Sequence, residues 1–368
     1  MKKIIVSVTN DLTTDQRVHK VCTSLVENGY AVMLIGRKLK NSLPLKRKYQ
    51  TTRMKLLFNK GYLFYAEYNL RLFLKLFFLK KDILVSNDLD TLVANYTIHK
   101  LFKSKLVYDS HELFTEVPEL IHRPKTQKIW LNIEERILPN LTNCITVCES
   151  ISAFYKKKYN IDFLIVRNVP LIAIGSNRVN QLPFDAKNKK IILYQGALNI
   201  GRGLELMIQT MQYLDNCIFA IAGTGDIEMK LKQLVIDYQL GTRIKFLGNL
   251  SPTNLKQITP LAHLGISFEE DLGLNYRYAL PNKIFDYIQA EVPCLVSDLP
   301  EMKRIVLDNN FGEIIKERTP ISLAKQIKAI FARNSDYMSW KNNLKMNKNI
   351  YNWESESKKI LGIYEFLA

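Results

Sequence analysis

Short apolar runs alternate with longer segments of helical periodicity along the whole chain. The first run is Ile4–Thr9; a helical segment follows from about Thr14 to Asn28, and Gly29 ends it. Uninterrupted apolar runs joined by helices are typical of parallel strands buried on both faces. Similar runs occur at Tyr30–Ile35, Ile83–Ser86, Leu106–Tyr108, Cys144–Val147, Ile191–Tyr194, Ile218–Ala222, Ile244–Leu247, Leu264–Phe268 and Pro293–Val296. The pattern predicts an α/β protein with doubly wound parallel sheets.

The alternation pauses once, near the middle of the chain. Residues 168–190 contain both turn-forming and charged residues, which is typical of a connection between domains. A chain of 368 residues is long enough for two domains, each with its own core. The sequence therefore predicts one domain over 1–167 and a second over 191–349.

One helix in the second half combines a core stripe with polar side chains. Pro281 suits a first helical turn, and Asn282 and Asp286 follow at helical spacing, with Lys283 beside Asp286 on a polar edge. A carboxylate and a lysine on the first turns of a helix can hold a ribose and a phosphate, and the helix N-terminus favours anions. A solvated helix face is the alternative.

Positive charge is concentrated in one region of the chain. The formal net charge is +17, and between Arg37 and Lys81 only Glu67 opposes the basic residues, which are interleaved with aromatic ones. The expected helix Tyr62–Lys80 is apolar apart from a narrow polar stripe. Such a surface suits an anionic membrane. A helix packed on a sheet behind a solvated basic loop is the alternative, and nucleic acid is a weaker one because no binding module accompanies the charge. The basic residues are Arg37, Lys38, Lys40, Lys46, Arg47, Lys48, Arg53, Lys55, Lys60, Arg71, Lys75, Lys80 and Lys81.

Cysteine use and hydropathy indicate a reducing, cytoplasmic environment. The five cysteines are scattered and form neither a disulfide framework nor a zinc motif. The N-terminal apolar run is too short for a signal peptide, and no window reaches the length of a membrane span.

Polar residues and glycines follow nearly every predicted strand. Ligands of open α/β sheets bind beyond the carboxyl ends of the strands, so these positions are candidates for a site. Each motif alone is weak, but their joint placement is informative. They are Asn10-Asp11 with Asp15-Gln16-Arg17, Asp109-Ser110-His111-Glu112, Gln195-Gly196-Ala197 with Gly201-Arg202-Gly203, Gly223-Thr224-Gly225-Asp226, Gly248-Asn249 and Glu269-Glu270-Asp271.

With these motifs the chain resembles the retaining glycosyltransferases of family 4 (glycosyl transferases group 1) over essentially its whole length. The matching pieces are DLTTDQRVHKVCTSLVENGY, SNDLDTLVA, KLVYDSHELFTEVPEL, LYQGALNIGRGLE, IAGTGD, FLGNLS and PNKIFDYIQAEVP. The resemblance implies the GT-B fold, in which two Rossmann-like domains face each other across a cleft. It further implies that 1–167 binds the acceptor, that 191–349 binds the nucleotide-sugar, and that a helix within 350–368 crosses back onto the first domain.

The resemblance also implies roles for particular residues. Asp286 would contact the ribose and Arg202 the diphosphate. The usual partner arginine is Ala197 here, so Lys283 is the candidate to replace it. The positions expected to bind the donor nucleotide are Gly196, Arg202, Gly223, Gly225, Lys283 and Asp286, and those expected to act in catalysis are His111, Arg202 and Lys283.

The residues expected to recognise the donor sugar and the acceptor align less exactly with the family's motifs. Tyr278 occupies the position of the family's first motif glutamate, so Glu269, Glu270 and Asn282 are the candidate sugar ligands. On the acceptor side the candidates are Asp11, Asp15 and Glu112.

The function expected from these features is retaining transfer of a sugar from a UDP- or GDP-sugar to a glycan or lipid-linked acceptor in surface polysaccharide synthesis. No metal or other cofactor is expected, because cationic side chains can meet the charge of the leaving diphosphate. We expect a cytoplasmic protein, peripheral on the inner face of the cytoplasmic membrane, and no nucleic acid partner. The alternatives are a nucleotide-sugar epimerase of the same fold and a non-catalytic basic scaffold.

Overall fold

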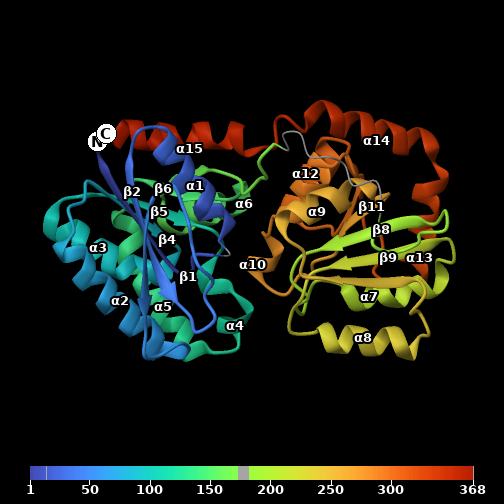
Figure 1. Ribbon diagram of the computed structural model, residues 1–368, viewed down its shortest axis with the longest axis horizontal. Helices are drawn as coiled ribbons and strands as arrows, with labels where there is room; N and C mark the ends of the chain where they lie inside the picture. Colours follow the sequence, from blue (N-terminus) through green and yellow to red (C-terminus); the bar gives the residue numbers. More distant parts are fainter. Residues whose placement is uncertain (14, 173–181, 368) are drawn as a thin grey trace. The chain divides into compact units, whose positions relative to one another are not determined.

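A computed structural model describes residues 1–13, 15–172 and 182–367, which divide into two compact units (Figure 1). The N-terminal unit contains Met1–Asn168 and the residues from Glu356 onward, and the C-terminal unit is Val169–Ser355. Of the predicted connection 168–190, residues 173–181 lie outside the described residues, and a strand begins at Lys190.

The N-terminal unit is built on a seven-stranded sheet in which every neighbouring pair is parallel, in the order β3-β2-β1-β4-β5-β6-β7. Its strands are β1 (Lys3–Asp11), β2 (Ala31–Lys38), β3 (Gln50–Lys55), β4 (Ile83–Asn87), β5 (Lys105–Ser110), β6 (Cys144–Thr146) and β7 (Phe163–Ile165). Its helices are α1 (Gln16–Glu27), α2 (Gly61–Phe78), α3 (Leu92–Phe102), α4 (Pro118–Ile121), α5 (Pro124–Ile137), α6 (Glu149–Tyr159) and α15 (Trp353–Leu367), the last shared with the C-terminal unit.

The C-terminal unit repeats this design with six parallel strands in the order β10-β9-β8-β11-β12-β13. Its strands are β8 (Lys190–Gln195), β9 (Cys217–Ala222), β10 (Ile244–Gly248), β11 (Leu264–Ser267), β12 (Cys294–Val296) and β13 (Gly312–Ile314). Its helices are α7 (Leu204–Thr210), α8 (Glu228–Asp237), α9 (Pro252–Ile258), α10 (Leu274–Arg277), α11 (Asn282–Gln289), α12 (Pro300–Asp308), α13 (Pro320–Ala332) and α14 (Asn334–Asn347).

Helices cover both faces of each sheet, which explains the apolar runs of the strands. All five residues of β4 and all six of β9 are buried. Figure 1 shows α1 and α2 on opposite faces of the N-terminal sheet, and α7 and α9 on opposite faces of the C-terminal sheet. Two covered faces leave no side on which a polar side chain would meet water, so the strands do not alternate in polarity. The predicted α/β class with doubly wound sheets is confirmed.

The strand order creates the same topological feature in both units. The chain winds outward from β1 to β3 and then returns to place β4 on the other side of β1; β8 and β11 are related in the same way. At such a switch point the loops after the two central strands diverge and leave room for a ligand beyond their carboxyl ends. The candidate residues that follow β1, β8 and β11 are therefore brought to two such points.

The last helix packs on the N-terminal unit, in agreement with the prediction that a helix within 350–368 crosses back onto the first domain. Figure 1 shows α15 along the same face as α1. The Tyr364 ring is buried and its centroid lies 6.3 Å from that of Tyr30, just after α1. Glu356 accepts a hydrogen bond of 3.0 Å from the backbone N–H of Arg167.

The basic region contains an edge strand that the sequence pattern does not reveal. Residues Gln50–Lys55 form β3 and pair with β2, although their letters (QTTRMK) are mostly polar. An edge strand with one free side tolerates polar and basic residues, which also discourage pairing with other chains. The expectation of a solvated basic loop throughout this region is therefore wrong for Gln50–Lys55.

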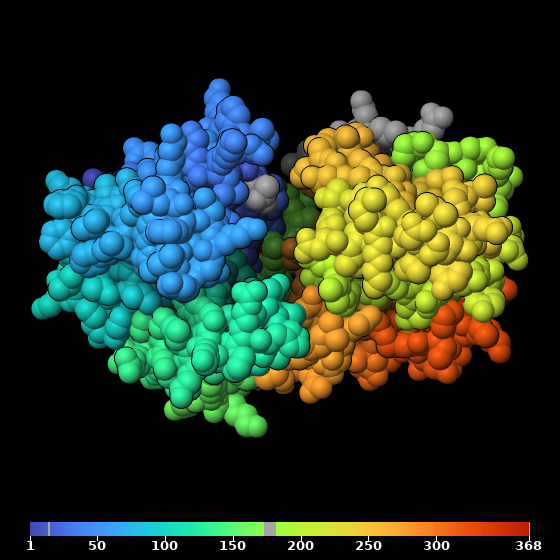
Figure 2. Space-filling model, turned by 90° about the horizontal axis from the view of Figure 1, so that it is seen from below, coloured from blue at the N-terminus to red at the C-terminus, as the bar shows by residue number. Residues whose placement is uncertain are grey.

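Helix α2 is packed on only one side. Its buried residues Phe64, Tyr68, Leu72 and Leu76 recur every four positions and form the stripe that faces the unit. The opposite face remains apolar and exposed, and Figure 2 shows this light-blue segment at the surface of the N-terminal unit. Among the described residues, no helix is both long and apolar enough to span a bilayer.

Candidate functional site

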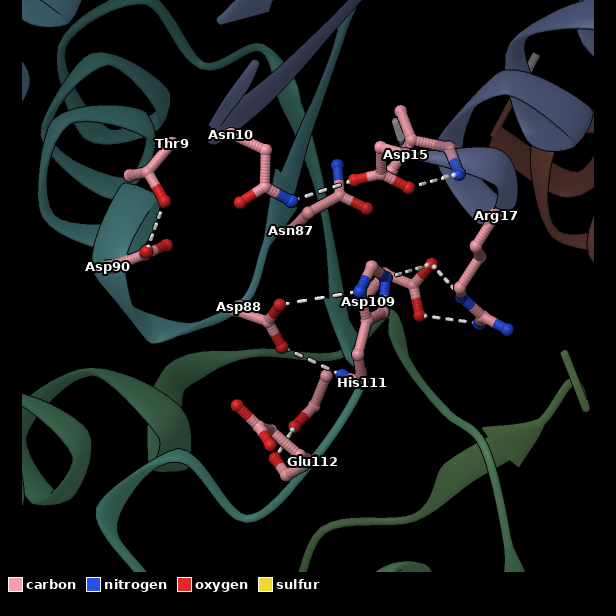
Figure 3. A network of polar contacts seen from close by, with 12 residues as sticks. Thr9, Asn10, Asp15, Arg17, Asn87, Asp88, Asp90, Asp109, His111 and Glu112 are labelled. Carbon is pink, nitrogen blue, oxygen red and sulfur yellow. Dashed lines mark hydrogen bonds and ion pairs between the residues drawn. The ribbon is translucent and has the colours of Figure 1, made fainter. Parts of the chain in front are cut away.

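Four charged side chains meet beyond the carboxyl ends of β4 and β5 in the N-terminal unit. His111 lies between two carboxylates: its Nδ1 is 3.3 Å from Asp88 Oδ2 and its Nε2 is 3.3 Å from Asp109 Oδ2 (Figure 3). Asp109 also pairs with Arg17 from α1, through bonds of 2.8 Å and 3.3 Å to its two oxygens. Arg17 is held by a further bond of 2.9 Å to the carbonyl of Val166. We call Asp88, Asp109, His111 and Arg17 the histidine cluster.

The surroundings of His111 favour its charged form. Burial alone would lower its pKa, but the carboxylates of Asp88 and Asp109 outweigh burial and raise the pKa to about 9. Burial likewise raises the pKa of Asp109, yet Arg17 and His111 hold it well below its usual range. At neutral pH the ring is therefore an imidazolium between two carboxylates.

Asp90 is a second buried acid near this cluster. It accepts a hydrogen bond from the hydroxyl of Thr9 at the end of β1. Burial and the neighbouring Asp88 raise its pKa to about 7. Asp90 therefore exchanges its proton near neutral pH, which is an unusual property for an aspartate.

The raised pKa of His111 leads to a pH-dependent stability. Relative to an unfolded histidine near pKa 6.5, the folded ring binds its proton more tightly, so its stabilisation is complete below pH 6.5 and disappears as the pH rises through about 9. We expect the N-terminal unit to lose up to about 3 kcal/mol over this range. Urea unfolding at a series of pH values should show this loss in the natural chain but not in His111→Gln. Equal pH profiles would contradict the prediction.

The other predicted residues of the N-terminal unit have structural partners. Asp15 caps α1 by accepting from the backbone N–H of Val18 at 3.0 Å and also accepts from the side chain of Asn10. Asp11 accepts from the backbone N–H of Thr13, and a hydrogen bond from Ser42 ties the loop after β2 to it. Asp11 is the last residue of β1 and Asp15 follows the strand, but these partners hold local structure.

A hydrogen bond to the backbone of Glu112 fixes the position of this residue. Its carbonyl accepts a hydrogen bond of 2.9 Å from Ser110, so the turn after β5 is fixed beside His111. Figure 3 shows its side chain next to the histidine cluster. Of the three predicted acceptor residues, Glu112 therefore lies beside His111, while Asp11 and Asp15 are engaged around the end of β1.

In the C-terminal unit, two cations converge on one buried carboxylate at the end of β11. Glu269 is fully buried, and its Oε1 lies 2.8 Å from Lys283 Nζ and 3.4 Å from Arg202 Nη1. The hydroxyl of Ser267 donates a further bond of 2.6 Å to Oε2. Lys283 Nζ also lies 4.1 Å from the centroid of the Tyr194 ring. We call Glu269, Lys283 and Arg202 the lysine cluster.

The lysine cluster carries more positive than negative charge. Burial alone would raise the pKa of Glu269, but Lys283 and Arg202 lower it and keep the carboxylate ionised. Burial lowers the pKa of Lys283, and its ion pair with Glu269 only partly restores it. One carboxylate shared by two cations leaves an unbalanced positive charge, and Arg202 retains partial exposure at 28%.

The predicted polar edge of α11 is wrong for Lys283. Its side chain is 8% exposed and pairs with Glu269 instead of lying beside Asp286 on the surface. Asp286 accepts a bond of 2.7 Å from Gln195 at the end of β8. Pro281 precedes the helix as its N-cap, and Asn282 is exposed at its first turn.

Glu269 and Glu270 are separated by the turn after β11, although they are adjacent in sequence. Glu269 is buried in the lysine cluster, whereas the Glu270 side chain is 41% exposed and lies 3.9 Å from Arg318. Arg318 donates bonds of 2.9 Å to the carbonyl of Phe268 and to the hydroxyl of Ser297. This arginine fixes the turn that carries both glutamates.

Two of the predicted glycines lie where two loops approach so closely that a larger residue would not fit. A Cβ at Gly223 would lie 1.8 Å from the carbonyl oxygen of Gly196, and one at Gly225 would lie 2.5 Å from that of Leu198. Gly223 also has φ +148°, which favours glycine. These residues let the loops after β8 and β9 pack together beside the lysine cluster.

Sequence reasoning names all three residues of the lysine cluster, but it misses Asp88 of the histidine cluster and the pairing of residues in and around both clusters. Asp88 and Asp90 follow β4 directly in the segment SNDLD, so their place after a strand is the signal that could have indicated them. Arg17 and Asp109 are 92 positions apart, and no local pattern links them. Gln195 and Arg318 likewise act on partners distant in sequence.

Among residues 1–13, 15–172 and 182–367, no group of three or more histidine, cysteine, aspartate or glutamate side chains is arranged to hold a metal ion.

Comparison with known families identifies the C-terminal half of the chain. Residues 180–352 match the family described as glycosyl transferases group 1. This segment covers nearly all of the C-terminal unit and includes the whole lysine cluster.

Two curated relatives share moderate identity with the chain. An uncharacterised glycosyltransferase of Methanocaldococcus jannaschii is 26% identical over 186 residues, which is 48% of this chain and 45% of the relative. The O-antigen chain mannosyltransferase RfbU of Salmonella typhimurium is 24% identical over 226 residues, 59% of this chain and 60% of the relative. The chain thus spans about half the length of these relatives.

Solved structures share the fold over the full length. Sucrose-phosphate synthase of Thermosynechococcus elongatus superposes with a TM-score of 0.83 at 16% identity, covering 100% of this chain and 99% of that one. HepE of Anabaena, solved in complex with UDP, has a TM-score of 0.71 at 13% identity, covering 99% and 100%. These likenesses confirm the predicted GT-B fold.

Proposed function

We propose that this chain, whose C-terminal unit belongs to the glycosyl transferases group 1 family, moves a sugar from a nucleotide-diphosphate donor to a glycan or lipid-linked acceptor. The donor binds the C-terminal unit and the acceptor the N-terminal unit. The relatives support this proposal, since one is an O-antigen mannosyltransferase and HepE is solved with UDP and with UDP-glucose.

The observation that carries the proposal is the lysine cluster. It lies at the switch point between β8 and β11, where an open parallel sheet binds its ligands. Two cations there share one buried carboxylate, so a diphosphate would balance the remaining positive charge. The charge on a diphosphate grows as the sugar–phosphate bond breaks, so a preorganised cation stabilises the transition state more than the ground state. No metal ion is needed for this step.

We further propose that the reaction retains the anomeric configuration, as in family 4. An inverting reaction requires a general base near the acceptor hydroxyl. Asp88 and Asp109 raise the pKa of His111 to about 9, which favours the protonated ring at neutral pH and so does not favour His111 as this base. The departing diphosphate then takes the acceptor proton on the face from which it leaves.

A nucleotide-sugar epimerase and a non-catalytic scaffold are the competing functions. An epimerase would change the free nucleotide-sugar without an acceptor, so analysis of the products with and without a glycan acceptor separates it from a transferase. A scaffold would bind no nucleotide-sugar.

Donor binding is the direct test of the lysine cluster. We expect UDP or GDP to raise the melting temperature of the natural chain, and Arg202→Ala to weaken nucleotide affinity about tenfold or more, because the exposed cation that meets the diphosphate is lost. The measurement is a thermal-shift titration with UDP, GDP and their sugar conjugates, followed by calorimetry. Arg243→Ala, on the same unit but paired with exposed Asp215, is the control. Equal affinity in all three proteins would contradict the assignment.

The acceptor side of the proposal includes a membrane surface. Leu63, Leu70, Leu74, Phe77 and Phe78 are between 40% and 82% exposed and lie on one face of α2. We call these five residues the exposed stripe. Phe102 of α3 extends it, with its ring centroid 5.2 Å from that of Phe77. An apolar stripe of this size on a helix is unusual for a free surface.

Basic residues border the exposed stripe at both ends of α2. Lys60 precedes the helix, Lys80 follows it, and both are exposed. Apolar side chains that enter the acyl region, flanked by lysines at headgroup level, are the features of an interfacial helix. We propose that α2 lies on the inner face of the cytoplasmic membrane, where a lipid-linked acceptor would be presented. Five free and buried cysteines accord with this reducing side.

Membrane binding is tested by flotation with liposomes. The natural chain should float with anionic vesicles at low salt, and the double variant Leu70→Ser, Phe78→Ser should bind about tenfold or more weakly, because two side chains no longer enter the bilayer. Ile236→Ser removes a similarly exposed apolar side chain, 67% exposed on α8, and should not change flotation. If the natural chain stays unbound, or the double variant floats equally, the membrane proposal is wrong.

A further inference from the structure

The backbone of Asp88 has an unusual conformation. Its φ is 56° and its ψ is 172°, between the end of β4 and a short helical turn that begins at Leu89. Lys103 and Asn160 also have positive φ, but their ψ values of 21° and 35° place them in the ordinary left-handed conformation at helix ends. The conformation of Asp88 is one that glycine adopts almost exclusively. An aspartate at this position is therefore strained, and glycine would relieve the strain.

This conformation aims the carboxylate of Asp88 at a single residue. Its Oδ1 accepts a bond of 2.8 Å from the backbone N–H of His111, and its Oδ2 lies 3.3 Å from the ring Nδ1 of the same residue (Figure 3). The backbone N–H of Asp88 donates in turn to the carbonyl of Asp109 at 2.9 Å. The carboxylate thus contacts both the backbone and the ring of His111.

A second carboxylate lies on the other side of the ring. Asp109 Oδ2 is 3.3 Å from His111 Nε2, and both oxygens of Asp109 also bind Arg17. Asp109 therefore divides its charge between the ring and Arg17, whereas the carboxylate of Asp88 contacts both the ring and the backbone N–H of His111.

We propose that Asp88 is a positioning residue that fixes the His111 ring with a proton on Nδ1, and that its strained backbone is retained because glycine has no carboxylate to do so. Compared with aspartate, glycine at position 88 would relieve the backbone strain but would lack the carboxylate that contacts both the ring and the backbone N–H of His111. The role of a fixed cationic ring in sugar transfer rests on the proposed function, whereas the position and charge of the ring do not.

The experiment uses the full chain without substrate. The pKa of His111 is measured by NMR titration of the histidine ring nitrogens in the ¹⁵N-labelled protein, with His111→Gln identifying its signals. Asp88→Asn keeps the shape and an acceptor for the backbone N–H but removes the charge, and it should lower the pKa of His111 by one unit or more. Asp162→Asn, an exposed aspartate of the same unit, should leave it unchanged. An unchanged pKa in Asp88→Asn overturns the proposal. The charged groups around the ring are Asp88, Asp109, Arg17, Asp15, Asp90 and Glu112.

Two further variants test the strain. Asp88→Ala and Asp88→Gly both lose the carboxylate, but only glycine relaxes the backbone. We expect Asp88→Gly to have the higher melting temperature of the two, the reverse of the usual order for alanine and glycine. A lower melting temperature for Asp88→Gly shows that the backbone is not strained and overturns that part of the proposal.

The reaction provides the last readout. If the chain transfers sugar as proposed, Asp88→Asn should lower kcat at least tenfold while nucleotide affinity, a property of the C-terminal unit, stays unchanged. A kcat within twofold of the natural chain overturns the role of the fixed ring in catalysis. Absence of transfer by the natural chain overturns the proposed function instead and leaves the NMR result standing.

Discussion

Replacing Lys283 with methionine is expected to lower the free energy of unfolding of the C-terminal unit by about 3–5 kcal/mol. Glu269 is fully buried, and without Lys283 it would keep only the longer contact of 3.4 Å with Arg202 and the bond from Ser267. A buried carboxylate deprived of its closest cation must either remain charged in a poor environment or take up a proton, and both states are costly. Urea unfolding of the natural and variant chains measures the difference.

A double variant separates the ion pair from simple packing. Lys283→Met combined with Glu269→Gln removes both charges, so much of the lost stability should return. Lys303→Met is the matched control, because its partner Asp298 and Lys303 itself are about half exposed, and it should change stability by less than about 1 kcal/mol. If Lys283→Met costs no more than the control, the buried pair is not important for stability.

The second large effect is expected on activity. His111→Gln should lower kcat about 100-fold or more, because the proposed transfer uses a fixed cation at this position and glutamine is neutral. Nucleotide affinity should be unchanged, since the proposed donor site lies in the C-terminal unit. The measurement is sugar transfer at saturating donor, with product detection by chromatography.

The control for this prediction is another histidine of the same unit. His122 is exposed and lies outside the histidine cluster, so His122→Gln should retain full activity. A kcat for His111→Gln within threefold of the natural chain would mean that His111 only stabilises the fold, and the assignment would have to be abandoned.

The two clusters illustrate how differently sequence patterns constrain a site. The place of His111 directly after a strand indicates a ligand-facing position, because the carboxyl ends of parallel strands meet at one edge of the sheet. Its partners are not predictable in this way. Asp88 comes from the preceding strand and Arg17 from the first helix, and only the order β1-β4-β5 brings them together.

Lys283 shows why a helical pattern can mislead. Its spacing from Asp286 correctly places the two residues near one another on α11, but periodicity says nothing about which neighbour each side chain meets. A long lysine side chain can turn away from the helix surface and reach a carboxylate on the loop after a neighbouring strand. In this fold it reaches Glu269, which a reading of the helix alone could not reveal.

By itself the sequence determined the succession of buried strands and helices, the two-unit architecture, and the positions after strands where polar residues would gather. It did so because burial on both faces of a parallel sheet leaves a mark in each strand separately. Tertiary structure alone decided which charges pair, that Lys283 is buried, that α2 keeps one apolar face exposed, and that Asp88 has a backbone suited to glycine. These features depend on the order of strands in the sheet and on contacts between residues distant in sequence, which no local period records.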